Sequence, residues 1–151
     1  MGQFYWQEYK DASFKLLPGV QELLVALLRR GIMCGLVTGA IDQIGRFKLR
    51  KTGLVRYFPI QHFGNETLTR ADLVRKALKR NALNHWAPFG NIVLFGDTKR
   101  DVEAGKSAGI RTVGVATGRF SKDQLKEVSP DFVLDDLTDT KAILKIFGVA
   151  L

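Results

Sequence analysis

Residues 91–118 read NIVLFGDTKRDVEAGKSAGIRTVGVATG and hold the most informative pattern in the chain. An apolar run at 92–95 leads into a Gly-Asp pair that contains Asp97, and a helical pattern then extends to Gly109. A second apolar run follows at 112–116. This order of strand, turn, helix and strand is typical of the βαβ unit of a parallel sheet.

Two carboxylates follow the first of these strands. Ligands of open parallel sheets bind outside the carboxyl ends of the strands, which is where Asp97 lies. Asp101 comes one helical turn later, so both carboxylates can face one point. Such a pair suits a hard cation such as Mg²⁺. A purely structural interpretation is also open: Asp97 or Thr98 caps the next helix, and Asp101 occupies its first turn.

The rest of the chain repeats this alternation of helix and strand. Apolar residues at helical spacing, glycine and proline punctuation and short apolar runs set the boundaries. Helices are expected at 20–30, 41–52, 69–83, 99–108, 121–128 and 138–147, and strands at 32–37, 57–63, 91–96, 111–116 and 131–134. The alternation predicts an α/β fold with a mainly parallel sheet between helix layers, Rossmann-like in its three-layer arrangement.

Composition indicates an ordinary globular protein. The 151 residues suit one domain, with 46% hydrophobic and 25% charged residues. No apolar run reaches the length of a membrane span, and the first residues lack the apolar segment of a signal peptide. Cys34 is the only cysteine and falls in an apolar run, so it is expected to be a buried small hydrophobe. We therefore predict a cytoplasmic protein with no membrane partner. Nothing in the sequence indicates an oligomeric state.

The net charge of +8 raises the question of an anionic partner. The basic residues are spread over two helical stretches, around 46–56 and 70–80, and are not interleaved with aromatic residues. Nucleic-acid-binding surfaces combine clustered basic residues with interleaved aromatic residues, so no nucleic-acid partner is expected.

Two other patterns do not indicate sites. Gly105-Lys106-Ser107 resembles the end of a P-loop, but Arg100 stands where that motif needs glycine, and the triplet ends a helix. His62 and His85 have no partner at metal-ligand spacing, so both are predicted to be structural or exposed.

Three elements in series carry a family resemblance. A strand ends at Thr38 in GLVTG, Arg70 begins the helix TRADLVRKAL, and a further strand ends in GDTKRD, which contains Asp97 and Asp101. Together they resemble the second, third and fourth motifs of the haloacid dehalogenase superfamily, and more narrowly its phosphoglycolate-phosphatase-like members. The similarity covers residues 16–147 and includes LLPGVQELLVALLRRGIMCGLVTG before Thr38.

The resemblance implies a Mg²⁺-dependent phosphatase that acts on a small phosphorylated molecule through an aspartyl-phosphate. Thr38 would donate its hydroxyl to a phosphoryl oxygen, aided by backbone N–H groups near Gly39. Arg70 would neutralise phosphoryl charge, and Asp97 and Asp101 would hold Mg²⁺.

Each of these assignments has an alternative. Thr38 could be an N-cap, and Arg70 could be a surface helix residue. Lys76 is the competing basic residue, but helical spacing places it about a turn and a half beyond Arg70. Arg70 is therefore preferred.

The superfamily's first motif, an apolar strand followed by D-x-D-G-T, supplies the nucleophile and is not found in this chain. The only early aspartate is Asp11, which has no apolar strand before it. We therefore expect residues 1–15 to be the remnant of a cap helix or an N-terminal extension, and residues 16–151 to be an N-terminally incomplete core domain.

Two functions follow from this departure. The favoured one is a truncated, inactive C-terminal part of such a phosphatase. The alternative is a non-catalytic module of the same fold that binds phosphate, Mg²⁺ or a partner. A receiver-like signalling domain is less favoured, because its acidic pair and central acceptor aspartate are missing.

Overall fold

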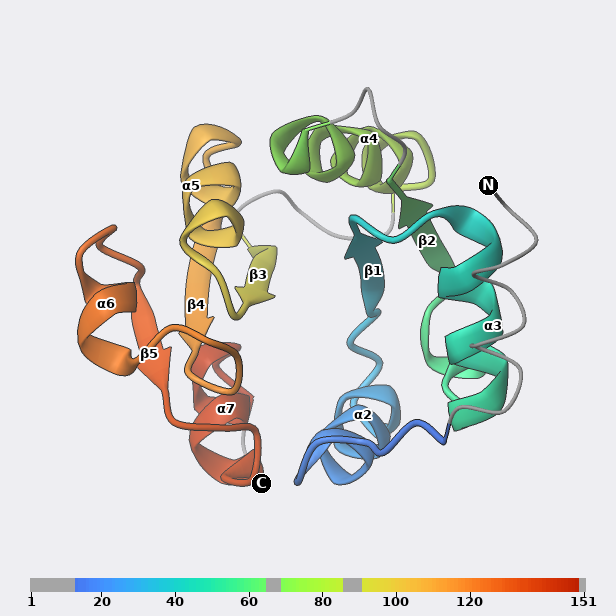
Figure 1. The fold of residues 1–151 in the computed structure, drawn as a ribbon, viewed down its shortest axis with the longest axis horizontal. Helices are drawn as coiled ribbons and strands as arrows, with labels where there is room; N and C mark the ends of the chain where they lie inside the picture. Colours follow the sequence, from blue (N-terminus) through green and yellow to red (C-terminus); the bar gives the residue numbers. More distant parts are fainter. Residues whose placement is uncertain (1–12, 65–68, 86–90, 150–151) are drawn as a thin grey trace.

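The computed structural model describes residues 13–64, 69–85 and 91–149. Helices and strands alternate along them, as the sequence predicts (Figure 1). The helices are α2 (Val20–Arg29), α3 (Asp42–Thr52), α4 (Arg70–Leu83), α5 (Lys99–Ser107), α6 (Lys122–Lys126) and α7 (Thr140–Ile146), with a 3-10 turn, η1 (Val55–Tyr57). The strands are β1 (Gly35–Thr38), β2 (Ile60–Phe63), β3 (Val93–Gly96), β4 (Arg111–Val115) and β5 (Phe132–Leu134). The predicted cap remnant at residues 1–15 falls mostly outside the described residues.

Glycines end the first two helices, as predicted. Gly31 has φ of 68° just beyond α2, and Gly53 is the C-cap of α3 with φ of 70°. A residue without Cβ adopts this left-handed conformation at little cost. The Gly53 N–H bonds to the Arg50 carbonyl at 3.2 Å, which satisfies one of the last helical acceptors.

The first two strands are shorter than predicted. β1 begins at Gly35, not at residue 32, because a strand extends only as far as its partner and β2 offers four residues. β2 begins after Pro59, whose ring nitrogen has no hydrogen to donate to a ladder. Tyr57, the first residue of that predicted strand, is instead the last residue of η1.

The strands form two parallel sheets. β1 pairs with β2, and β4 lies between β3 and β5. All three pairings are parallel, as the βαβ pattern predicts. The division into two sheets differs from the single sheet expected from the alternation, because within the described residues no hydrogen-bonded ladder joins β1 to β3.

Helices cover both faces of these sheets (Figure 1). On one face, Val74 of α4 and Ala104 of α5 form a buried cluster with Ile110. On the other, residues of α2 and α7 form a second cluster that includes Leu23 and Ile143. Burial of these apolar side chains holds the layers together.

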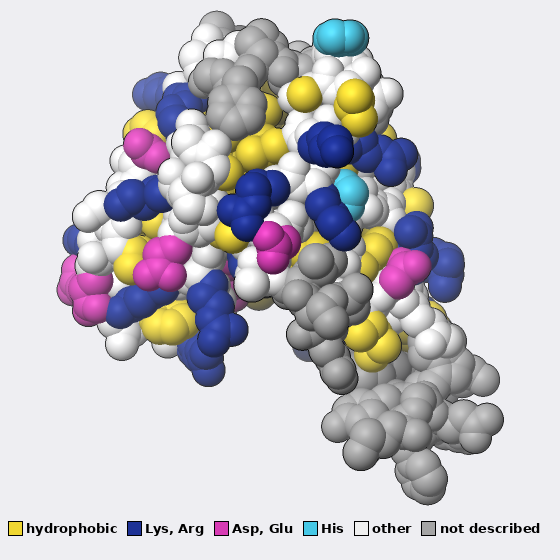
Figure 2. Space-filling view, turned by 90° about the horizontal axis from the view of Figure 1, so that it is seen from above, with side chains coloured by type: hydrophobic (Ala, Val, Ile, Leu, Met, Phe, Trp, Pro, Cys, Tyr) yellow, Lys and Arg dark blue, Asp and Glu magenta, His cyan; other side chains and the backbone are white. Residues whose placement is uncertain are grey.

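The surface is rich in charge. Figure 2 shows Lys and Arg side chains scattered over one face and interspersed with Asp and Glu. Within the described segments, no helix combines the length and the apolar character needed to cross a membrane.

Candidate active site

The turn between β3 and α5 places both predicted carboxylates. Thr98 is the N-cap of α5, and its hydroxyl accepts a hydrogen bond from the Asp101 N–H at 3.3 Å. Asp101 Oδ2 in turn accepts from the Thr98 N–H at 3.1 Å and from the Thr98 hydroxyl at 2.7 Å. This reciprocal pair is a capping box, so the structural interpretation of Thr98 and Asp101 holds.

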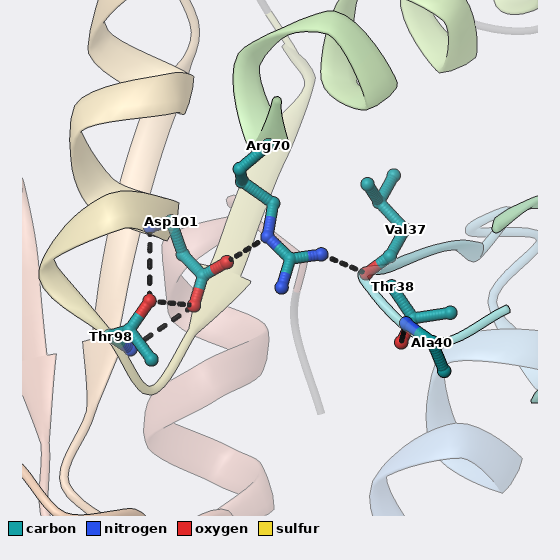
Figure 3. A network of polar contacts seen from close by, with 6 residues as sticks. All are labelled: Val37, Thr38, Ala40, Arg70, Thr98 and Asp101. Atoms are coloured by element: carbon teal, nitrogen blue, oxygen red, sulfur yellow. Dashed lines mark hydrogen bonds and ion pairs between the residues drawn. The ribbon is translucent and has the colours of Figure 1, made fainter. Parts of the chain in front are cut away.

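Asp101 also has a partner outside its own helix. Its Oδ1 lies 2.8 Å from Nε of Arg70, the first residue of α4. The Arg70 Nη1 group donates to the Val37 carbonyl at 3.2 Å, near the end of β1 (Figure 3). The side chains of Arg70 and Asp101 are 26% and 11% exposed. Arg70 is therefore a partly buried link between the two sheets, and not the surface helix residue of the alternative interpretation.

Thr38 ends β1 beside this link. Its Oγ1 accepts a hydrogen bond from the Ala40 N–H at 3.2 Å, which leaves the hydroxyl hydrogen free to be donated elsewhere. The N-cap of α3 is Ile41, so Thr38 does not cap that helix. Gly39 lies next to the guanidinium group: a Cβ at Gly39 would come within 3.8 Å of Arg70 Nη2.

Asp97 is exposed at the end of β3. None of the hydrogen bonds and ion pairs found between residues 13–64, 69–85 and 91–149 involves its carboxylate. The backbone of Gly118, in the loop after β4, packs directly on it: a Cβ at Gly118 would lie 2.4 Å from Asp97 Oδ2. The loops after β3 and β4 therefore meet at this carboxylate.

The donor set suits a cation that keeps most of its water ligands. No three carboxylate, histidine or cysteine groups gather at one point in the described part of the chain. Asp97 offers a carboxylate to solvent, whereas both oxygens of Asp101 have protein partners. Mg²⁺ binds proteins through one or two carboxylates, with water and substrate phosphate completing its shell. Asp97 fits that role, and the present contacts of Asp101 suit the positioning of Arg70.

The competing basic residue lies elsewhere. Lys76 is exposed on α4 and acts electrostatically on His62 of β2. Burial, followed by the charges of Arg80 and Lys76, lowers the pKa of that imidazole. Arg70 is thus the basic residue that the structure brings to Asp101, while Lys76 lies near another strand.

Comparisons with known proteins show which family this chain resembles. A family model described as HAD-hydrolase-like matches residues 70–140, which include Arg70, Asp97 and Asp101. The chain belongs to the haloacid dehalogenase-like hydrolase superfamily.

Two curated relatives illustrate the similarity. Phosphoglycolate phosphatase of Synechococcus elongatus is 28% identical over 127 residues, covering 84% of this chain and 58% of the relative. Pyrophosphatase PpaX of Listeria monocytogenes is 30% identical over 146 residues, covering 93% of this chain and 66% of the relative. The chain thus spans about six tenths of the length of these relatives.

Solved structures show the same fold. A predicted phosphoglycolate phosphatase from Haemophilus somnus superposes with a TM-score of 0.75 at 25% identity, covering 95% of this chain and 62% of that one. A haloacid dehalogenase-like protein from Streptococcus pneumoniae superposes with a TM-score of 0.74 at 18% identity, covering 86% of this chain and 60% of that one. The α/β, Rossmann-like assignment is therefore confirmed.

Two glycines contribute to the site although sequence reasoning did not select them. A Cβ at Gly96 would lie 2.1 Å from Asp101 Cβ, so only glycine lets β3 end this close to α5. Gly118 has the corresponding role at Asp97. Gly96 stands inside the superfamily's fourth motif, which is a usable signal, but the contact of Gly118 follows only from the packing of one loop on another.

Proposed function

We propose that Thr38, Gly39, Arg70, Asp97 and Asp101 form the phosphate-binding and Mg²⁺-binding part of a phosphatase site for small phosphate monoesters. The observation that carries the proposal is the position of Arg70, which contacts both Asp101 and the end of β1. The similarity to phosphoglycolate phosphatase and to pyrophosphatase PpaX supports the same class of reaction.

The side chains suit a bound phosphoryl group. A guanidinium has five N–H donors, and Arg70 uses its Nε and one Nη1 donor in the contacts to Asp101 and Val37. The remaining donors can bind phosphoryl oxygens, and the fixed charge would stabilise the added negative charge of the transition state. The Thr38 hydroxyl can donate to another phosphoryl oxygen from the end of β1.

Asp97 would hold Mg²⁺, and Asp101 would hold the Arg70 guanidinium in position toward the phosphoryl group. When bound, Mg²⁺ supplies positive charge to the phosphoryl oxygens and to the attacking carboxylate. The capping box and the Arg70 contact hold Asp101 in one orientation, so this part of the site is organised before ligand binds.

The attacking carboxylate itself is not identified. The superfamily resemblance implies an aspartate nucleophile, and Asp11, the only early aspartate, lies outside the described residues. We therefore propose that the 151-residue chain binds Mg²⁺ and phosphate but turns over little substrate. The alternative function, a non-catalytic binding module, makes the same binding prediction.

Melting curves test the binding. Mg²⁺ should raise the melting temperature by mass action, and Asp97→Asn should abolish the increase. Asp123→Asn is a matched control, because Asp123 is an exposed carboxylate in the first turn of α6. An unchanged melting temperature at roughly tens of millimolar Mg²⁺ would contradict a formed site.

Hydrolysis of p-nitrophenyl phosphate with Mg²⁺ tests the catalytic part. Little or no release of nitrophenol is expected from the chain alone. Robust hydrolysis that is lost in Asp97→Asn would show that the chain carries a nucleophile not recognised from its sequence.

A further inference from the structure

The loop that follows β4 brings a cation to the candidate site. Residues 116–121 join β4 to α6, and Gly118 in this loop packs on the Asp97 carboxylate, where a Cβ would lie 2.4 Å from Oδ2. Arg119 is the next residue, and consecutive Cα atoms are only about 3.8 Å apart. Its side chain is exposed. Arg119 therefore starts beside the carboxylate that is proposed to hold Mg²⁺.

An aromatic ring brings a second cation to the same place. The Arg119 guanidinium carbon lies 5.4 Å from the centroid of the Phe120 ring, and Lys99 Nζ lies 5.8 Å from that centroid. The negative face of an aromatic ring attracts cations within roughly 6 Å of its centroid. Lys99 is the first residue of α5 and follows Asp97 by two positions. The ring therefore gathers one cation from each of the two segments that meet at Asp97.

The loop after β4 is hydrogen-bonded at both of its ends. The Ala116 N–H donates to the Leu134 carbonyl at 2.9 Å, at the end of the pairing between β4 and β5. The Ser121 N–H donates to the side-chain oxygen of Gln124 at 2.9 Å, and the Gln124 N–H donates to the Ser121 hydroxyl at 3.2 Å. Because both ends are held, the residues between them have a defined position beside the site.

The two cations differ in how their charge is neutralised. Lys99 forms an ion pair with Glu127, at the end of α6. In residues 13–64, 69–85 and 91–149, no carboxylate forms an ion pair with Arg119, whose side chain contacts the Phe120 ring. A guanidinium presents five N–H donors in a planar fork that matches the oxygens of a carboxylate or a phosphate. Arg119 therefore offers a positioned charge to an anion beside Asp97.

We propose that Arg119, positioned by Phe120 and supported by the charge of Lys99, binds a second anionic group of the substrate. This inference rests on the phosphatase site proposed above: Arg70 and Thr38 would bind the phosphoryl group, and Arg119 would bind a carboxylate or a second phosphate on the rest of the same molecule. The substrate class is therefore a small phosphorylated molecule that carries an additional negative charge.

Two simpler roles of the cluster predict different results. If Arg119 only covers the Phe120 ring, its replacement should lower the stability and change no ligand preference. If the net charge of +8 attracts anions in general, the loss of any nearby exposed cation should have the same effect. The test therefore compares two ligands that differ in one charge, and two cations that differ in their contact with the ring.

Calorimetric titration of the full chain with phosphonates, at one fixed Mg²⁺ concentration, provides this test. Phosphonoacetate and phosphonoacetamide share a phosphonate that is not hydrolysed, and the second group is a carboxylate in one and a neutral amide in the other. Phosphonoacetate should bind at least about tenfold more tightly, which is the size of effect expected for one hydrogen-bonded charge pair. Chelation of Mg²⁺ by the ligands is the same for every variant and cancels when variants are compared.

The variants identify the residue responsible. Arg119→Gln should reduce the preference to less than about threefold, and Phe120→Leu should reduce it in part because the guanidinium loses its ring contact. Lys126→Gln is the control: Lys126 is exposed on α6 and pairs with Asp123 at 3.1 Å, so this variant should keep the full preference. Melting curves of the free variants check that each one folds.

A third ligand distinguishes the two possible anions. Methylenediphosphonate carries a second phosphonate in place of the carboxylate. The ligand that loses more affinity in Arg119→Gln, this one or phosphonoacetate, carries the anion that the subsite takes, and a loss with either supports the subsite.

The remaining outcomes separate this inference from the proposed function. Equal affinity of the unaltered chain for phosphonoacetate and phosphonoacetamide overturns the subsite, and the phosphate site still stands if Arg70→Gln weakens both ligands. A preference that survives Arg119→Gln, or that Lys126→Gln removes equally, also overturns the subsite. If neither phosphonate binds, the proposed phosphate site fails, and the subsite fails with it.

Discussion

The link between Arg70 and Asp101 should be an energetically coupled pair. Exposed ion pairs contribute about 0.2–1 kcal/mol, whereas removing one partner of a fully buried pair costs about 3–5 kcal/mol. Side-chain exposures of 26% and 11% place this pair between those limits. Asp101→Asn keeps an oxygen that can accept from Thr98, so its main loss is the charge. We expect a coupling free energy of about 1–2 kcal/mol between Asp101→Asn and Arg70→Gln.

The chain contains a matched control for this measurement. Asp72 also closes a capping box, with Thr69, and also pairs with an arginine, Arg75. Its side chain and that of Arg75 are 37% and 56% exposed, so solvent screens their interaction. The coupling between Asp72→Asn and Arg75→Gln should therefore be clearly smaller than that between Asp101→Asn and Arg70→Gln.

Urea unfolding of each single and double variant gives both coupling free energies, provided that the slope of the unfolding free energy against urea concentration is the same in all variants. If the Arg70–Asp101 coupling does not exceed that of the Asp72–Arg75 control by more than about 0.5 kcal/mol, then Arg70 does not link the two sheets as described.

Two further predictions concern single residues. Gly118→Ala should displace Asp97, since its Cβ would lie 2.4 Å from Oδ2, and should abolish stabilisation by Mg²⁺. The control Gly35→Ala, at the start of β1 with its nearest contact at 3.5 Å, should retain that stabilisation, and equal Mg²⁺ responses of the two variants in melting curves would contradict this packing. Hydrogen bonds from Thr69 and Arg75 lower the pKa of Asp72 from 3.8 to about 2. Its stabilising effect should therefore be complete above the unfolded pKa and disappear as pH falls toward 2, and NMR titration that gives an unshifted carboxyl would refute it.

The order of elements could be predicted because it depends on local patterns. Apolar spacing in α2 and α4, and the glycines after α2 and α3, identify helices and their ends without reference to the rest of the chain. The strand lengths could not be predicted in this way. β1 is shorter than its apolar run because a strand requires a neighbour, and β2, its partner in the part of the chain that the structure describes, begins only after Pro59.

The residues of the candidate site could likewise be selected from the sequence, whereas their contacts could not. Asp97 and Asp101 could be selected from their spacing after an apolar strand, and Arg70 from its place in a series of motifs. Their separate tasks could not be predicted from spacing. Asp101 bonds to Thr98 and Arg70, while Asp97 is exposed against Gly118, and these contacts arise from segments far apart in the chain.

The sequence by itself therefore determined the α/β class and the parallel βαβ unit, because those features depend on periodicity, while its resemblance to the superfamily motifs selected the candidate site residues Thr38, Arg70, Asp97 and Asp101. Only the tertiary structure decided that Arg70 joins Asp101 to the end of β1, and that no ladder joins β1 to β3 within the described residues. The physical reason is that hydrogen bonds between strands and partly buried ion pairs depend on which distant segments meet, and apolar spacing along one segment carries no information about its neighbours.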